Sequence, residues 1–325
     1  MQKHLARLVL CAIPMVLPFL AGTATAQSIG FAEAVDRLAV SCKGDIDKFC
    51  KKVALGGGKV QQCLEQNAAG VSAGCKATVS DLGVLLQTRA RARGAVLQVC
   101  DTDIRRLCAG IQQGDGNLME CFYKARRNIS PQCQQVVTDA GFDVALAPTA
   151  STTQVALDSR DMLESLQGVE AAAVRINAAS LRQLAVQGMA DPSRASRVNR
   201  EPLSDQLGKL AQFTIAIQFD FDSARTRPDS FRAVGLMADA LNHPYLQGYR
   251  FLIVGHTDGK GNREYNLKLS QRRADAIREA LINPFGIPAN RIEAVGLGEE
   301  QLLNRANPEA AENRRVQLIN IGPRR

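Results

Sequence analysis

Two neighbouring stretches decide the fold: Gly255-His256-Thr257-Asp258, and Tyr265-Asn266-Leu267-Lys268-Leu269-Ser270-Gln271-Arg272-Arg273-Ala274. The first follows the apolar run 249–254, which predicts a strand buried between layers, with a loop after Gly255. The second lies in a predicted helix over about residues 263–282. Its sheet-facing positions recur at helical spacing and are Leu267, Ser270, Ala274, Ile277 and Leu281. A strand, a loop carrying a carboxylate and a helix therefore follow one another.

The flanking residues extend this alternation of strands and helices. Residues 213–219 alternate apolar and less apolar side chains, which predicts a strand, and Pro228 begins a helix of about four turns. Short strands near 291–295 and 315–321 complete a β-α-β-α-β-β order. Two crossover helices imply parallel strand pairs covered on one face, which is a two-layer α/β sandwich.

The loop and the second helix together predict a binding site. Asp258 leads into the N-terminus of the helix, where backbone N–H groups and the positive end of the helix dipole converge. Arg273 lies further along the same helix. An aspartate and an arginine on one rigid frame suit a zwitterion, because the carboxylate accepts from an ammonium and the guanidinium grips a carboxylate. The free end of a diaminopimelate side chain carries both groups.

Together with Phe219-Asp220-Phe221-Asp222 and Asn313-Arg314-Arg315-Val316, these motifs resemble the OmpA-like C-terminal domain, a peptidoglycan-binding module. The resemblance covers residues 213–325. It implies that Asp258 and Arg273 bind diaminopimelate and that Asp222 lines the same pocket. The remaining carried-over positions, which shape the loop or the pocket wall, are Thr257, Asn266, Leu267 and Arg315. His256 is expected to pack within the loop.

The N-terminal part holds a tandem repeat with a period of 58 residues over 27–140. Its eight cysteines follow the spacing C-x7-C-x12-C-x11-C twice, as Cys42, Cys50, Cys63, Cys75, then Cys100, Cys108, Cys121, Cys133. An even set of cysteines in an exported chain predicts disulfides. Zinc is the competing interpretation, but the close cysteine pairs of metal sites are lacking, and we expect neither a metal nor a cofactor.

Helical stretches flank a Gly-rich bend in each repeat, at residues 55–58 and 113–116, which indicates all-α helical hairpins. Antiparallel helices would bring the two cysteines nearest the bend together and the outer two together. This predicts Cys42 with Cys75, Cys50 with Cys63, Cys100 with Cys133 and Cys108 with Cys121. The sequence by itself leaves three connectivities open in each repeat.

The repeats are similar to the cysteine-rich Golgi-apparatus-protein repeat, through Cys42, Asp45-Ile46, Phe49-Cys50, Cys63-Leu64 and the step from Ser72 to Cys75. The resemblance implies an extracytoplasmic interaction module. The alternative is that the bridges simply stabilise small helical units with little core.

Residues 1–26 have the pattern of a secretory signal peptide: Lys3 and Arg7, an apolar run, and Ala24-Thr25-Ala26 before the predicted cleavage. Cys11 lies inside the apolar run, so no lipid anchor is expected. Removing the peptide takes away two positive charges and no acid, so the formal net charge of +8 becomes +6. No other run reaches the roughly 18 to 20 apolar residues of a membrane helix.

Residues 141–212 predict a short, partly helical connector that spaces the two modules. Residues 147–153 have linker composition, the leucines within 159–187 have helix-compatible spacing (Leu163, Leu166, Leu181 and Leu184), and residues 191–197 break the pattern. The chain as a whole is expected to be α+β. The function expected is non-enzymatic binding of diaminopimelate-type peptidoglycan, in the periplasm at the outer membrane of a Gram-negative bacterium, tethering the cysteine-rich module to the wall. In the alternative, the protein is a scaffold or receptor that acts on an envelope protein through its repeats, and the C-terminal domain only localises it. Nucleic acid is not expected as a partner.

Overall fold

The computed structural model describes residues 28–53, 55–111, 116–142, 159–167, 176–190 and 207–324. The predicted signal peptide, most of the second bend and both linker-like stretches lie outside these residues. The N-terminal elements are α1 (Phe31–Phe49), η1 (Gly56–Gly58), α2 (Lys59–Gln66), α3 (Ala73–Val99), α4 (Asp101–Leu107), α5 (Asn117–Lys124), η2 (Arg126–Asn128) and α6 (Pro131–Asp139).

The C-terminal elements are β1 (Gln212–Ile215), η5 (Pro228–Ser230), α10 (Phe231–Leu241), η6 (Pro244–Leu246), β2 (Tyr249–His256), α11 (Arg263–Ile282), η7 (Ala289–Arg291), β3 (Ile292–Gly298), η8 (Ala311–Asn313) and β4 (Val316–Pro323). Their order confirms the predicted β-α-β-α-β-β domain. Among the described residues no helix is both long enough and apolar enough to cross a membrane.

The sheet order, β1-β4-β2-β3, differs from the predicted parallel pairs. Of the four strands in the described residues, only β2 and β3 are adjacent and parallel, because β4 lies between β1 and β2 and is antiparallel to both. The first strand is also shorter than predicted and ends at Ile215. Phe219 instead forms an isolated antiparallel bridge with Thr226, so a closed loop follows the strand.

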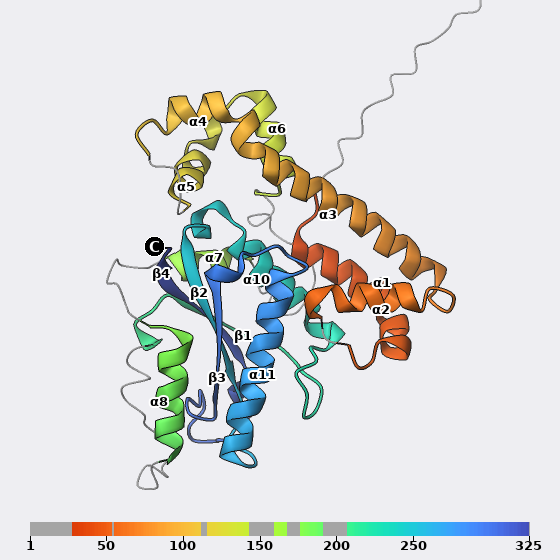
Figure 1. Ribbon diagram of the computed structural model, residues 1–325, viewed down its shortest axis with the longest axis vertical. Coiled ribbons are helices and arrows are strands. Elements are labelled where there is room, and N and C mark those ends of the chain that lie inside the picture. Colours follow the sequence, from red (N-terminus) through yellow and green to blue (C-terminus); the bar gives the residue numbers. More distant parts are fainter. Residues whose placement is uncertain are drawn as a thin grey trace, which may run out of the picture.

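Both faces of the sheet are covered, whereas the sequence predicted one. Alternate residues of β2 enter two separate cores: Phe251 and Ile253 pack with α10 and α11, and Leu252 and Val254 pack with α8 (Ala178–Ala190). Alternation follows from the two-residue period of a strand. Figure 1 shows α8 and α11 on opposite sides of the sheet.

The connector therefore does not act as a simple spacer where it is described. Leu181 and Ala185 of α8 pack on the sheet. Helix α7 (Ser159–Gln167) places Met162, Leu163 and Leu166 in the main core beside α10. The predicted helical leucine spacing was right, but its partner is the C-terminal domain.

The structure confirms all four predicted disulfides: Cys42–Cys75, Cys50–Cys63, Cys100–Cys133 and Cys108–Cys121. The sequence predicted two helices in the first repeat. The structure has three, because the segment after the Gly-rich bend is divided into α2 and α3. One long helix, α3, joins the two repeats (Figure 1). We call the part carrying Cys42–Cys75 the first repeat and the part carrying Cys100–Cys133 the second repeat.

The first repeat is docked on the C-terminal domain through a buried polar contact. Asp239 of α10 accepts hydrogen bonds from the backbone N–H groups of Phe31 and Ala32, at 2.9 Å each, and so caps α1. Arg89 of α3, 1% exposed, donates to the same carboxylate at 2.9 Å. A Cβ on Gly235 would come within 2.5 Å of Ala32 Cα, so this close approach of α1 and α10 requires glycine.

Candidate functional site

Asp258 lies in the loop between β2 and α11, as the sequence predicted. Its carboxylate accepts from the Arg314 guanidinium at 2.6 Å and from the backbone N–H of Lys260 at 3.3 Å. The Asp258 side chain is 16% exposed, so it faces solvent through a narrow window. A carboxylate can accept about four hydrogen bonds, so Asp258 has acceptor capacity for a further donor.

Arg273 on α11 is 9% exposed, and its guanidinium is fixed on two sides. Its Nε donates to the Ser223 carbonyl at 2.9 Å, and its Cζ lies 4.8 Å from the centre of the Phe219 ring. Among the described residues, neither Nη atom donates a hydrogen bond to the protein. The two Nη atoms are therefore available to a ligand carboxylate in a fixed orientation.

The electrostatic balance links these groups. Burial lowers the pKa of the Arg273 guanidinium, and Asp258 and Asp222 oppose this, while Arg314 and Arg272 add to it. Since the ordinary pKa of arginine is far above neutrality, Arg273 stays charged. A buried cation with donors not used by the described residues, beside two acidic groups, can bind groups of both signs of charge.

Asp222 lies in the loop that supports Arg273. It is the one described non-glycine residue with a positive φ, at 52°, and its carboxylate is 3.9 Å from Arg272. A non-glycine residue in this region costs conformational energy, and the conformation persists only where its surroundings impose it. The neighbouring Phe221 is fully exposed, so this loop projects from the domain. Asp222, Asp258 and Arg273 are together called the candidate site.

Of the weaker predicted positions, three frame the loop that holds Asp258. Asn266 is buried, and its Nδ2 donates to the carbonyl of Lys260 at 3.0 Å and to Glu299 at 2.7 Å. The backbone N–H of Thr257 donates to Gly298, and Leu267 is partly buried against the core under α8.

The side-chain hydrogen bonds of Arg315 within the described residues go to Asn313, Gln301 and Gln317, none of which belongs to the candidate site. Arg315 is 7% exposed, and its Nη atoms donate to the carbonyls of Asn313 and Gln301, at 3.4 and 2.9 Å. Burial lowers the pKa of Arg315 to about 10. His256 is also buried, as expected for a packing residue, and burial lowers its pKa well below the usual value.

Sequence reasoning missed Arg314, which is the arginine that contacts Asp258. The two arginines are adjacent in the motif just before β4. Consecutive side chains along extended chain point in opposite directions, so one reaches the loop and the other turns inward. The motif revealed the pair, but the direction of each side chain depends on the sheet around it. Ser223 was also missed, because its contribution is a backbone carbonyl.

A family model described as "OmpA family" matches residues 218–315, and one described as "Cysteine rich repeat" matches residues 33–71. The chain is 37% identical over 132 residues to a peptidoglycan-associated lipoprotein of Pseudomonas putida, covering 39% of this chain and 77% of the relative. This chain belongs to the OmpA family.

Two further proteins are similar to part of the chain. Outer membrane porin F of Pseudomonas aeruginosa is 34% identical over 113 residues, which is 34% of this chain and 32% of the porin. The chain thus spans about a third of that relative. The crystal structure of the peptidoglycan-associated lipoprotein from Burkholderia pseudomallei is 35% identical, with a TM-score of 0.28, covering 35% of this chain and 92% of that one.

Proposed function

We propose that this protein binds diaminopimelate-containing peptidoglycan non-covalently in the periplasm, with Asp258 accepting from the ligand ammonium and Arg273 donating to its carboxylate. The observation that carries the proposal is the fixed, buried guanidinium of Arg273, whose Nη atoms have no protein acceptor among the described residues. Two relatives named peptidoglycan-associated lipoprotein, at 37% and 36% identity, support it. The role is binding, not catalysis.

The candidate site supplies recognition at both ends of a zwitterion. Asp258 is held by Arg314 and by the Lys260 backbone, so it needs little reorganisation to accept a third donor. Arg273 is already oriented by Ser223. Preorganised groups lose less conformational entropy when a ligand binds. Binding at this site would tether the repeats to the wall.

The test is co-sedimentation of the purified mature protein with insoluble peptidoglycan at matched salt. Wild type is expected to pellet, and Asp258→Ala and Arg273→Ala are expected to lose about 10- to 100-fold in affinity, as for a lost charged hydrogen bond. Matched controls are Asp275→Ala and Lys268→Ala, which change the same charges at exposed positions of α11. Equal pelleting by all variants would show nonspecific binding and reject the proposal.

A further inference from the structure

The orientation of Arg273 depends on a loop outside its own helix. This loop, residues 219–226, supplies both the Ser223 carbonyl that accepts from Arg273 Nε and the Phe219 ring under the guanidinium. We call it the site loop. It also carries Asp222. The position of the site loop therefore determines where Asp222 and the Arg273 guanidinium lie.

Arg225 closes the site loop from within. Its Nη1 lies 2.5 Å from Asp220 Oδ2, while its backbone carbonyl accepts from the Asp220 N–H at 3.0 Å. Its side chain is 9% exposed, and neither Nε nor Nη2 makes a hydrogen bond with the described residues. A buried guanidinium is costly unless acidic groups compensate its charge. Asp220 supplies part of this compensation.

The other part comes from the first repeat. Asp47 of α1 has its Oδ1 3.8 Å from Arg225 Nη2, across the interface between the repeat and the C-terminal domain. Two more ion pairs join α1 to the residues that follow the site loop: Lys43 with Asp229 at 3.1 Å, and Asp36 with Arg232 at 3.5 Å. Residues 36, 43 and 47 share one face of α1, because they are seven and four residues apart.

We propose that Arg225 is a positioning residue of the candidate site and that Asp47 of the first repeat holds it in place, so that the repeat is a working part of the binding site. The contacts form a continuous path from the repeat to the site. Asp47 compensates the charge of Arg225, Arg225 closes the site loop, and the site loop orients Arg273 through Ser223. This inference rests on the proposed function. It gives the first repeat a role that does not require any further partner.

The test compares Asp47→Asn with Asp36→Asn by titration calorimetry, using a soluble muropeptide with a free diaminopimelate end. Both residues are half-exposed carboxylates of α1 that face an arginine of the other domain, at 51% and 49% exposure, but only Asp47 contacts the site loop. Asp47→Asn is expected to weaken binding about 2- to 30-fold, the range of residues that act through others. Asp36→Asn should stay within about 2-fold, and Asp47→Glu should restore affinity.

A double-mutant cycle separates positioning from general stability. Arg273→Lys keeps the positive charge but replaces the planar guanidinium that Ser223 orients by a flexible ammonium, so the path ends there. In this background Asp47→Asn should have no further effect on affinity. The effects of two substitutions on affinity are non-additive when the residues act through one path. If Asp47→Asn acts by another route, it weakens affinity equally in both backgrounds. Additive effects would reject the inference.

The remaining outcomes are also decisive. If Arg273→Ala loses affinity while Asp47→Asn and wild type bind equally, the inference is wrong and the proposed function stands. If the wild-type protein does not bind the muropeptide, both are wrong, since no site exists to be positioned. Thermal unfolding midpoints of all variants, measured in parallel, confirm that each binding value belongs to folded protein.

Discussion

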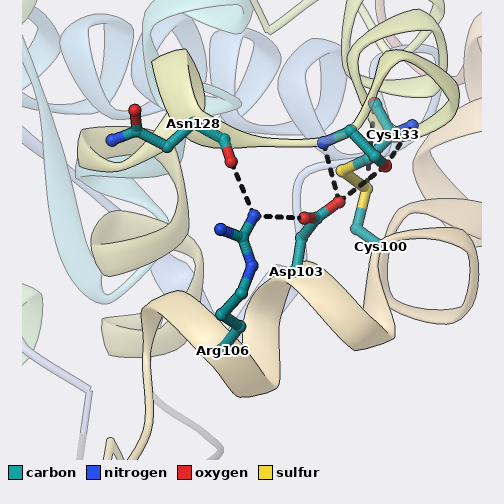
Figure 2. The surroundings of a disulfide bond; sticks show 6 residues. Cys100, Asp103, Arg106, Asn128 and Cys133 are labelled. Carbon is teal, nitrogen blue, oxygen red and sulfur yellow. Dashed lines mark hydrogen bonds and ion pairs between the residues drawn. A yellow bond between two sulfur atoms is a disulfide. The ribbon is translucent and has the colours of Figure 1, made fainter.

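The two cysteine-rich repeats have the same internal construction. In each, the bridged cysteines are separated by 33 and 13 positions. In each, an aspartate accepts from the hydroxyl of the serine three residues before the last cysteine, at 2.7 Å, and that serine caps the following helix: Asp45 with Ser72, and Asp103 with Ser130. Figure 2 shows Asp103 beside the Cys100–Cys133 disulfide of the second repeat.

Their contacts with the C-terminal domain are different. The first repeat docks through the buried Arg89–Asp239 pair. The second docks through rings: Tyr123 of α5 lies edge-on to His243 and Tyr245, with centroids 4.7 and 5.2 Å apart. The disulfides and the aspartate–serine contact therefore maintain the fold of each repeat, while other side chains determine what each copy contacts.

The largest expected effect comes from removing the carboxylate that docks the first repeat. Asp239→Ala would leave Arg89 buried without its partner and α1 without its cap. Breaking a buried ion pair from one side costs about 3 to 5 kcal/mol. Chemical denaturation would measure this loss. Asp229→Ala is the control, because its exposed pair with Lys43 should contribute less than about 1 kcal/mol. Equal losses in both variants would contradict the buried docking contact.

Next in size are the short disulfides, which allow the repeats to be compared directly. Replacing Cys50 and Cys63 by Ser should cost about 3 kcal/mol in the free energy of unfolding, and so should replacing Cys108 and Cys121, because both loops have the same length. Denaturation of the two double variants tests this. A clearly larger loss in one repeat would show that its docking depends on that bridge.

A pH effect should separate the docking of the second repeat from that of the first. Burial lowers the pKa of His243 to about 3, and the positive charges of Arg126 and Arg93 lower it further. The other groups facing the imidazole are the rings of Tyr123 and Tyr245. Since the folded state keeps this imidazole neutral, its contribution to stability is complete above the unfolded pKa. It declines as pH falls from about 6.5 to 3.

We therefore expect stability about 1 kcal/mol lower near pH 5.5 than near pH 7.5 because of this residue. The variant His243→Asn should remove that part of the decline, because Asn can still accept from the Tyr245 N–H, as the imidazole does now, without titrating. Denaturation curves at the two pH values are the measurement. An unchanged decline in the variant would show that other groups cause it.

The smallest expected effect concerns the aspartate–serine contact itself. In the second repeat, Asp103 also accepts from Arg106 at 2.8 Å (Figure 2), whereas Lys48, at the matching position of the first repeat, lies over the Phe49 ring. The Ser130 backbone and hydroxyl and Arg106 lower the pKa of Asp103 to about 2. Its contribution is therefore present above about pH 4 and lost as pH falls towards 2.

Accordingly, Asp103→Asn should lower stability at neutral pH and converge with wild type near pH 2. Asp45→Asn, which lacks the arginine partner, should have the smaller effect. Acid unfolding followed by circular dichroism compares them. A greater loss for Asp45→Asn would mean that Arg106 contributes nothing to the contact.

Local patterns predicted much of the fold and part of the candidate site. The period of 58 and the cysteine spacing predicted the four disulfides, once the helices on either side of each bend were taken as antiparallel. Strand and helix periodicity was sufficient for the β-α-β-α-β-β order and for the buried face of α11. The motif after the buried strand predicted that Asp258 lies in the loop between β2 and α11. The contact of Asp258 with a ligand stays a prediction.

Other features depend on contacts between distant residues. The insertion of β4 between β1 and β2 is a choice of partner, and backbone hydrogen bonding leaves no trace in side-chain alternation. Leucine spacing in α8 identified an apolar face but not the sheet that it covers. Arg314 and Arg315 are indistinguishable as residue types.

The sequence by itself determined which units form, because helix and strand periodicity, turn residues and short disulfide loops act over a few tens of residues. Only the tertiary structure decided how the units meet: the capping of α1 by Asp239, 208 positions away, and the contact between Asp47 and the site loop. The physical reason is that a buried charge or an orphan helix N–H requires some partner, but its chemistry does not say which. Packing of the whole chain makes that choice.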